Sequence, residues 1–170
     1  RFGREDYFFH AKHTPSGDII FLKRRQHQDN WSTSHNNSII NTNDGGFALI
    51  GNTKSIDGHF SNKKRNGSDI FLMKFDSNLN LQWTKTYGGS EDDRGQDLVQ
   101  LSDDGYVLVG YSKSSDGDSS ENRGQHDNWL IRTDPSGLII WEKSFGFSGH
   151  DHAYNIICLL YTSPSPRDKT

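Results

Sequence analysis

Short apolar runs, separated by turns rich in Asp, Gly, Ser and Asn, make up the hydrophobic pattern of this chain. Each run has the length of one β-strand, and the run at 79–83 alternates apolar and polar residues as a half-buried strand does. The runs that predict strands cover 47–53, 70–75, 79–83, 97–101, 106–112, 128–133, 138–143 and 154–157. No capped segment with helical periodicity is longer than about 10 residues. The pattern therefore predicts an all-β fold of antiparallel strands.

The strand pattern repeats along the chain. The segment 44–51 (DGGFALIG) returns 59 residues later as 103–110 (DDGYVLVG), and 69–76 (DIFLMKFD) returns 58 residues later as 127–134 (DNWLIRTD). Residues 1–43 carry the same pattern less clearly, with apolar runs for a further three strands. Several aligned motifs at almost constant spacing indicate an internal structural repeat.

Four short strands in each unit of about 50–60 residues are typical of a β-propeller blade. On this interpretation, 1–43 is a partial blade with the last three strands, 44–102 and 103–157 are full blades, and 158–170 is a tail. Propellers close with about four to eight blades. The chain would then be a propeller fragment of about two and a half antiparallel, four-stranded blades. Its partners would be the remaining blades of a larger ring. A β-sandwich and a β-solenoid built from similar hairpins are the alternatives.

The propeller interpretation also assigns places to particular residues. The strand after each Asp-Gly turn would be innermost, where close packing favours Gly51 and Gly110. Trp83 and Trp141 would fill the space between neighbouring blades.

The repeat stops abruptly after residue 157. Residues 158–168 (CLLYTSPSPRD) resemble a translated sequencing adapter, which predicts that 158–170 is non-native and that Cys158, the single cysteine, does not belong to the repeat. The alternative is a genuine Ser/Pro-rich linker.

Three strings in the last repeat, DGYVLVGYS at 104–112, DNWLIR at 127–132 and WEKSFG at 141–146, resemble the repeats of large secreted proteins from Bacteroidota-type bacteria. Such proteins often end in a type IX secretion sorting domain. The resemblance implies a propeller and an extracellular or cell-surface location. The string TDPSGLIIW at 133–141 is also similar to the tryptophan-docking repeats of quinoprotein propellers, a similarity that concerns blade packing rather than function.

Composition narrows the classes of function. Hydrophobic residues make up only 31% of the chain, but the 12% of aromatic residues argues against disorder. No apolar run reaches the roughly 18 residues of a membrane-spanning helix. The net charge of -3 and the short basic runs at 23–25 and 63–65 do not indicate nucleic-acid binding. No nucleophile elbow, P-loop, dinucleotide fingerprint or Cys-x-x-Cys motif occurs in the sequence, so no catalytic residue is predicted.

The loop 114–122 is the calcium candidate of the sequence. Asp116, Asp118 and Ser120 alternate along it, a spacing that is compatible with the oxygen ligands Ca²⁺ prefers. Position 12 of such a loop holds Asp127 instead of the usual bidentate Glu, which favours a solvated polar loop. Apart from this calcium ion, the sequence predicts no cofactor.

Other polar clusters have simpler explanations. Asp92, Asp93 and Asp151 recur in successive repeats, which favours carboxylates that accept backbone N–H bonds in turns over acid–base catalysis. His150 and His152 would point to the same side of an extended segment. Such a pair of histidines could bind zinc or copper, but no third ligand is nearby in the sequence. Ordinary loop histidines are therefore favoured.

Together these features predict a non-catalytic scaffold or recognition segment of an exported bacterial propeller protein. One alternative is a quinoprotein- or hydrolase-type propeller enzyme whose active site lies outside this fragment. Another is a carbohydrate-binding surface that uses exposed aromatic residues such as Trp31 or Tyr111. The expected partners are the remaining blades and a surface glycan or protein ligand, without nucleic acid.

Overall fold

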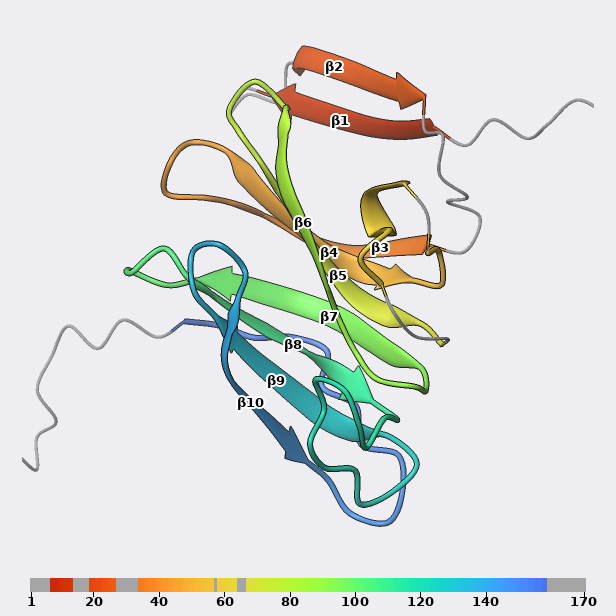
Figure 1. Cartoon of the computed structure of the whole chain (residues 1–170). Coiled ribbons are helices and arrows are strands. Elements are labelled where there is room, and N and C mark those ends of the chain that lie inside the picture. The colour runs from red at the N-terminus through yellow and green to blue at the C-terminus, as the bar shows by residue number, and fades with distance from the viewer. Residues whose placement is uncertain (1–6, 14–18, 27–33, 57, 64–66, 159–170) are drawn as a thin grey trace, which may run out of the picture.

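A computed structural model describes residues 7–13, 19–26, 34–56, 58–63 and 67–158 (Figure 1), the first two segments by their backbone alone. The predicted tail from 159 onward and Trp31 lie outside the described residues. The described strands are β1 (Tyr7–His13), β2 (Ile19–Gln26), β3 (Ser34–Asn41), β4 (Phe47–Thr53), β5 (Asp69–Phe75), β6 (Leu81–Tyr87), β7 (Asp93–Gln100), β8 (Tyr106–Ser112), β9 (Asp127–Thr133) and β10 (Ile139–Phe145). One short 3-10 helix, η2 (Gly58–Phe60), lies between β4 and β5.

Two four-stranded sheets form the body of the fold, and the prediction of an all-β, antiparallel protein is confirmed. The first sheet has the order β3-β4-β5-β6 and the second the order β7-β8-β9-β10, with every neighbouring pair antiparallel. β1 and β2 pair in a separate two-stranded sheet. The predicted strand at 154–157 is wrong, because 151–158 lies outside any strand.

The sheets are offset by one strand from the repeats predicted at 44–102 and 103–157. β7 pairs with β8 across the turn 101–105, where the Asp104 N–H donates to the Leu101 carbonyl at 3.0 Å. A tight turn of this kind makes consecutive strands hydrogen-bonded partners. A repeated sequence defines a period but no starting point, so the motif alone could not show where one sheet ends.

A β-bulge in the first strand of each sheet explains two of the repeated glycines. The register of β3 shifts between Asn36 and Ser38, and Gly51 of β4 lies opposite the shift. A Cβ at Gly51 would collide with a backbone carbonyl of β3, and the same holds for Gly110 of β8 and β7. Both glycines lie in the second strand of their sheet, so it is the bulged neighbouring strand that excludes a side chain here.

The core lies between the two sheets, which pack face to face (Figure 1). It joins apolar residues from strands β4 to β9: Ala48, Ile50, Ile70, Leu72, Tyr87, Leu98, Tyr106, Leu108, Trp129 and Ile131. Trp83 of β6 packs against this core, with its ring edge-on to Tyr106 at 6.0 Å. The opposite face of the first sheet forms a second cluster with Phe60 of η2: Leu49, Phe60, Phe71, Met73 and Phe75.

Candidate functional site

A line of polar contacts joins β3, β7 and the segment around Ile156, which follow one another at a constant spacing along the chain. Asp97 of β7 accepts a hydrogen bond from the Ser38 hydroxyl of β3 at 2.7 Å and another from the Ile156 N–H at 3.1 Å. Each of these partners lies 59 residues from Asp97 along the chain. The segment that contains Ile156 therefore lies beside β7, as β7 lies beside β3.

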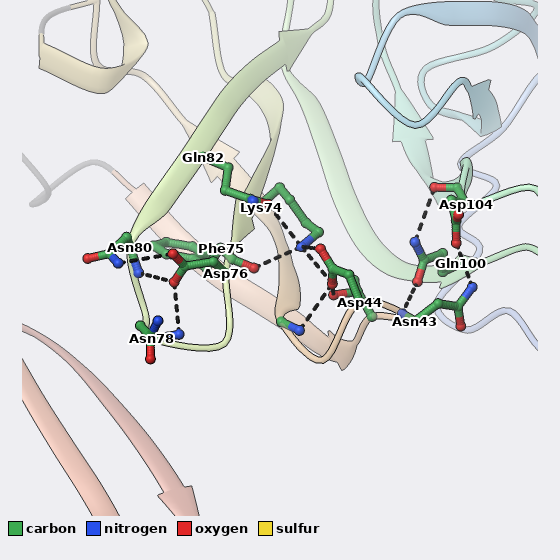
Figure 2. A network of polar contacts seen from close by, with 12 residues as sticks. Asn43, Asp44, Lys74, Phe75, Asp76, Asn78, Asn80, Gln82, Gln100 and Asp104 are labelled. Atoms are coloured by element: carbon green, nitrogen blue, oxygen red, sulfur yellow. Dashed lines mark hydrogen bonds and ion pairs between the residues drawn. The ribbon is translucent and has the colours of Figure 1, made fainter.

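The aspartate of the repeated Asp-Gly turn pairs with a buried cation, a contact that the sequence pattern did not predict. The buried Lys74 ammonium bonds to the Asp44 carboxylate at 2.7 Å and to the Phe75 carbonyl at 2.8 Å (Figure 2). These contacts lower the pKa of Asp44 to about 2, chiefly through the Lys74 hydrogen bond. In the second sheet, Arg132 bonds in the same way to Asp103. The alignment of Lys74 with Arg132 in the repeat could have indicated this ion pair from the sequence.

A neighbouring network in Figure 2 joins the equivalent turns of the two sheets. The Asn43 N–H donates to the Gln100 side-chain oxygen at 2.8 Å, and the Asn43 amide donates to the Asp104 carboxylate at 2.8 Å. The Gln100 amide also donates to the Asp104 carbonyl at 3.1 Å. Both turns therefore serve inter-sheet contact.

The residues of the predicted calcium loop bond to different parts of the chain. Asp116 accepts from the Ser90 N–H at 2.8 Å and Asp118 from the Gly88 N–H at 3.1 Å, so both carboxylates hold the connection between β6 and β7. Ser120 donates instead to Glu142 of β10. These residues thus have a structural task, and calcium binding stays a prediction.

Asp93 and Asp151 accept backbone N–H bonds from their own turns, which confirms that part of the sequence prediction, whereas Asp92 accepts from a loop 24 residues earlier in the chain. Asp92 accepts from the Ser68 N–H at 2.9 Å, and Asp93 from the Gly89 N–H at 2.8 Å. Asp151 accepts from the Phe147 N–H at 2.8 Å in the next repeat. Burial raises the pKa of Asp93, although hydrogen bonds from Ser112 and other groups favour its carboxylate form.

A buried ion pair adjoins this turn in the first sheet. The Lys63 ammonium lies 3.4 Å from the Asp69 carboxylate, and both side chains are almost inaccessible to solvent. Burial raises the pKa of Asp69 to about 7, and the attraction of Lys63 offsets only part of that effect. In the second sheet, the equivalent Asp127 accepts from the Arg123 N–H at 2.8 Å.

Three histidines come together at the corner of the second sheet. His126 directly precedes β9, and the two rings of His150 and His152 lie close to it. One possible ligand atom from each of the three lies within 4.8 Å of the others, the one such group of His, Cys, Asp or Glu found in the described part of the chain. The Nδ1 atoms of His126 and His150 are 2.5 Å apart.

Backbone contacts hold this histidine cluster together. His126 and His150 form an isolated parallel bridge, the Asp151 N–H donates to the His126 carbonyl at 2.7 Å, and the Gln125 N–H donates to the Gly149 carbonyl at 2.9 Å. Burial lowers the pKa of His126, and the neighbouring His150 adds to the effect. A neutral imidazole is the form that binds a metal.

Aromatic residues enclose His152. The Tyr111 ring stacks on it with centroids 4.0 Å apart, and the Tyr154 hydroxyl lies 3.3 Å from its Nδ1. Its Nε2 is buried and has no hydrogen-bond partner among the described residues. Tyr111 itself is only 9% exposed, so its predicted role as an exposed sugar-stacking platform is wrong.

The sequence pattern indicates the His150–His152 pair but does not indicate His126. The third histidine precedes its neighbours by more than 20 residues and approaches them only through the packing of the loop at 147–152 against the start of β9. The repeat offered one signal. Ser68 and Asp92 occupy the equivalent places one repeat earlier, so histidine here belongs to a single repeat.

Comparison of the chain with models of protein families gives no match, and comparison with curated protein sequences gives no match either. Within the described residues, no helix has the length and apolar character that crossing a membrane requires.

Proposed function

We propose that the two sheets are successive blades of a β-propeller and that this part of the protein is a non-catalytic scaffold or recognition segment. The observation that carries the proposal is the pair of Asp97 contacts to Ser38 and Ile156, both at a spacing of 59 residues. Side-by-side first strands of successive sheets are the arrangement expected of inner strands around a propeller axis. On this proposal β3 and β7 would be innermost, in place of the strands after the Asp-Gly turns, β4 and β8.

The packing of the sheets supports this arrangement over a sandwich. The second sheet meets the first with the face that carries Leu108 and Ile131. The equivalent residues of the first sheet, Leu49 and Met73, lie on the face turned away from the second sheet. Each sheet would therefore present one face to its predecessor and the other to its successor. Head-to-tail contacts of this kind form a ring when the rotation closes.

A further blade would cover an apolar surface that the described residues leave open. Trp141 and Phe145 of β10 are 41% and 52% exposed, whereas Tyr87, the equivalent of Phe145, is 3% exposed in the inter-sheet core. The remaining blades are thus the expected partners.

The distribution of the polar groups supports the scaffold role. The carboxylate turns and the Lys74 and Arg132 contacts recur in both sheets, which is expected of groups that maintain the fold. By the resemblance of the last repeat to secreted proteins, we place the protein outside the cell or at its surface.

The test is to express the chain together with the segments that flank it in its gene and to image the product by electron microscopy. A closed ring in which Trp141 fluorescence is shielded from acrylamide would support the proposal. A separate two-sheet domain in which Trp141 is quenched as in the isolated chain would contradict the propeller. Turnover of any substrate that is lost on substitution of residues in this chain would contradict the non-catalytic role.

A further inference from the structure

We propose that His126, His150 and His152 form a binding site for a divalent transition-metal ion, with Zn²⁺ as the expected occupant. Three imidazoles with ligand atoms within 4.8 Å of one another offer the nitrogen donors that zinc, copper and nickel prefer. Three histidine ligands with a fourth position for water or an external ligand are an established zinc arrangement in proteins. This site is separate from the proposed blade scaffold and does not depend on it.

The distances fit a metal after a small movement of the rings. Zinc–nitrogen bonds of about 2.0–2.1 Å in a tetrahedron place two ligand nitrogens roughly 3.3 Å apart. The Nδ1 atoms of His126 and His150 are 2.5 Å apart, and the widest separation in the cluster is below 4.8 Å. The distance between the Nδ1 atoms of His126 and His150 must increase by less than about 1 Å, and the other nitrogen–nitrogen distances must decrease by up to about 1.5 Å. Rotation of the exposed His150 side chain can supply much of this.

The backbone is already arranged for binding. Hydrogen bonds between 125–126 and 149–151 bring the two chain segments together without an ion. Binding therefore does not have to close the loop that separates them, which lowers the entropic cost of forming the site.

The surroundings of His152 supply an independent indication. Its Nδ1 lies 3.3 Å from the Tyr154 hydroxyl, and such an outer contact fixes the tautomer of a metal-binding histidine. Its Nε2 is buried without a hydrogen-bond partner among the described residues, a costly state that an ion would relieve. The Tyr111 ring, stacked at 4.0 Å, fixes the plane of the imidazole.

The equivalent corner of the first sheet shows that the fold does not need histidine here. There the Ser68 N–H donates to the Asp92 carboxylate at 2.9 Å, and Asn52, the counterpart of Tyr111, donates to the Ser68 hydroxyl at 3.3 Å. Ordinary hydrogen bonds thus complete the same corner. The three histidines thus occur at this corner in one repeat and not at the equivalent corner of the first sheet, as expected of a site that binds a ligand.

The test titrates ZnCl₂ into the metal-free full chain by calorimetry and follows the melting temperature. We expect one Zn²⁺ per chain and a rise of about 5–10 °C at a hundredfold excess over Kd. His126→Gln and His152→Gln should each weaken binding at least tenfold. His35→Gln, at an exposed histidine of β3, and Cys158→Ser, at the exposed thiol, should bind as the wild type does.

Replacing Zn²⁺ with Co²⁺ gives a readout that does not depend on stability. An intense visible absorption of four-coordinate Co²⁺ in the wild type and in His35→Gln, and its loss in His126→Gln, would support the site. Equal melting temperatures of the metal-free variants would show that they fold. Binding that survives both His126→Gln and His152→Gln, or no saturable binding up to 1 mM Zn²⁺, would overturn the proposal.

Discussion

Strands β6 and β10 occupy equivalent places in the two sheets but have opposite surroundings. Trp83 and Tyr87 of β6 pack into the inter-sheet core, and the Tyr87 hydroxyl donates to the Gly137 carbonyl of the second sheet at 2.8 Å. Trp141 and Phe145 of β10 are exposed. The two strands share their aromatic pattern, so the neighbouring sheet, and not the local sequence, decides whether these side chains are buried.

The largest effect is expected in the core that the two sheets share. Trp129 is fully buried, and its Nε1 donates to the Glu142 carboxylate at 2.7 Å. Trp129→Ala should lower the free energy of unfolding by about 3–5 kcal/mol, because a large cavity forms between the sheets. Urea denaturation followed by circular dichroism measures this. A loss below about 1 kcal/mol would mean that the sheets do not pack together as described.

The paired tryptophans test the comparison directly. Trp83→Ala should lower the free energy of unfolding by about 1.5–3 kcal/mol, because the ring leaves the core. Trp141→Ala should change it by less than about 0.5 kcal/mol, as for other exposed positions. The same urea titration serves both variants. Equal losses would contradict the difference between β6 and β10.

Asp69 and its equivalent Asp127 have different partners in the two sheets, and the burial of Asp69 predicts that stability depends on pH. The pKa of Asp69 is about 7 in the folded chain, against roughly 3.9 when unfolded. Because the folded state binds the proton more tightly, this group stabilises the fold below pH 4, and the contribution is lost as the pH rises through 7. The free energy of unfolding of Asp69→Asn, relative to that of the wild type, should therefore rise by about 1–3 kcal/mol between pH 4.5 and 8.

Urea titrations at several pH values measure that gain. Glu121→Gln, which removes an exposed carboxylate paired with Arg123, is the matched control and should follow the wild type throughout. A pH-independent difference between Asp69→Asn and the wild type would show that Asp69 is ionised at its ordinary pKa.

The smallest expected effect comes from making β6 resemble β10. Tyr87→Phe places in β6 the residue type that β10 has as Phe145, and removes the buried hydrogen bond to Gly137. The Gly137 carbonyl then lacks that donor, which should cost about 0.5–1.5 kcal/mol. Phe145→Tyr should leave thermal stability almost unchanged, because Phe145 is half exposed and no second sheet of the described residues covers it. A larger change for Phe145→Tyr would reverse the comparison.

Much of the local structure could be predicted from the residues. β4 and β8 have the predicted bounds, because apolar runs that follow Asp/Gly turns specify strands through local preferences. The turns of Asp93 and Asp151 were also predictable, since each aspartate accepts from an N–H group of its own turn, whereas the bond from the Ser68 N–H to Asp92 depends on a distant loop. The boundary between the sheets was not predictable. The strand residues of β7 are compatible with a place in the sheet of β6 or in the sheet of β8.

The candidate metal site divides in the same way. The spacing of His150 and His152 indicated a pair, because two residues in an extended segment share one side. His126 joins them only because the loop at 147–152 packs against the start of β9.

The sequence by itself determined the repeat period, the local turns and most of the strands, though not the absence of a strand at 154–157. These features depend mainly on residues close together along the chain. The tertiary structure alone decided which strands share a sheet, which of two equivalent aromatic strands is buried, and where three histidines meet. Those outcomes depend on contacts between distant segments, and the free energy of such contacts comes from the packing partner as much as from the residue itself.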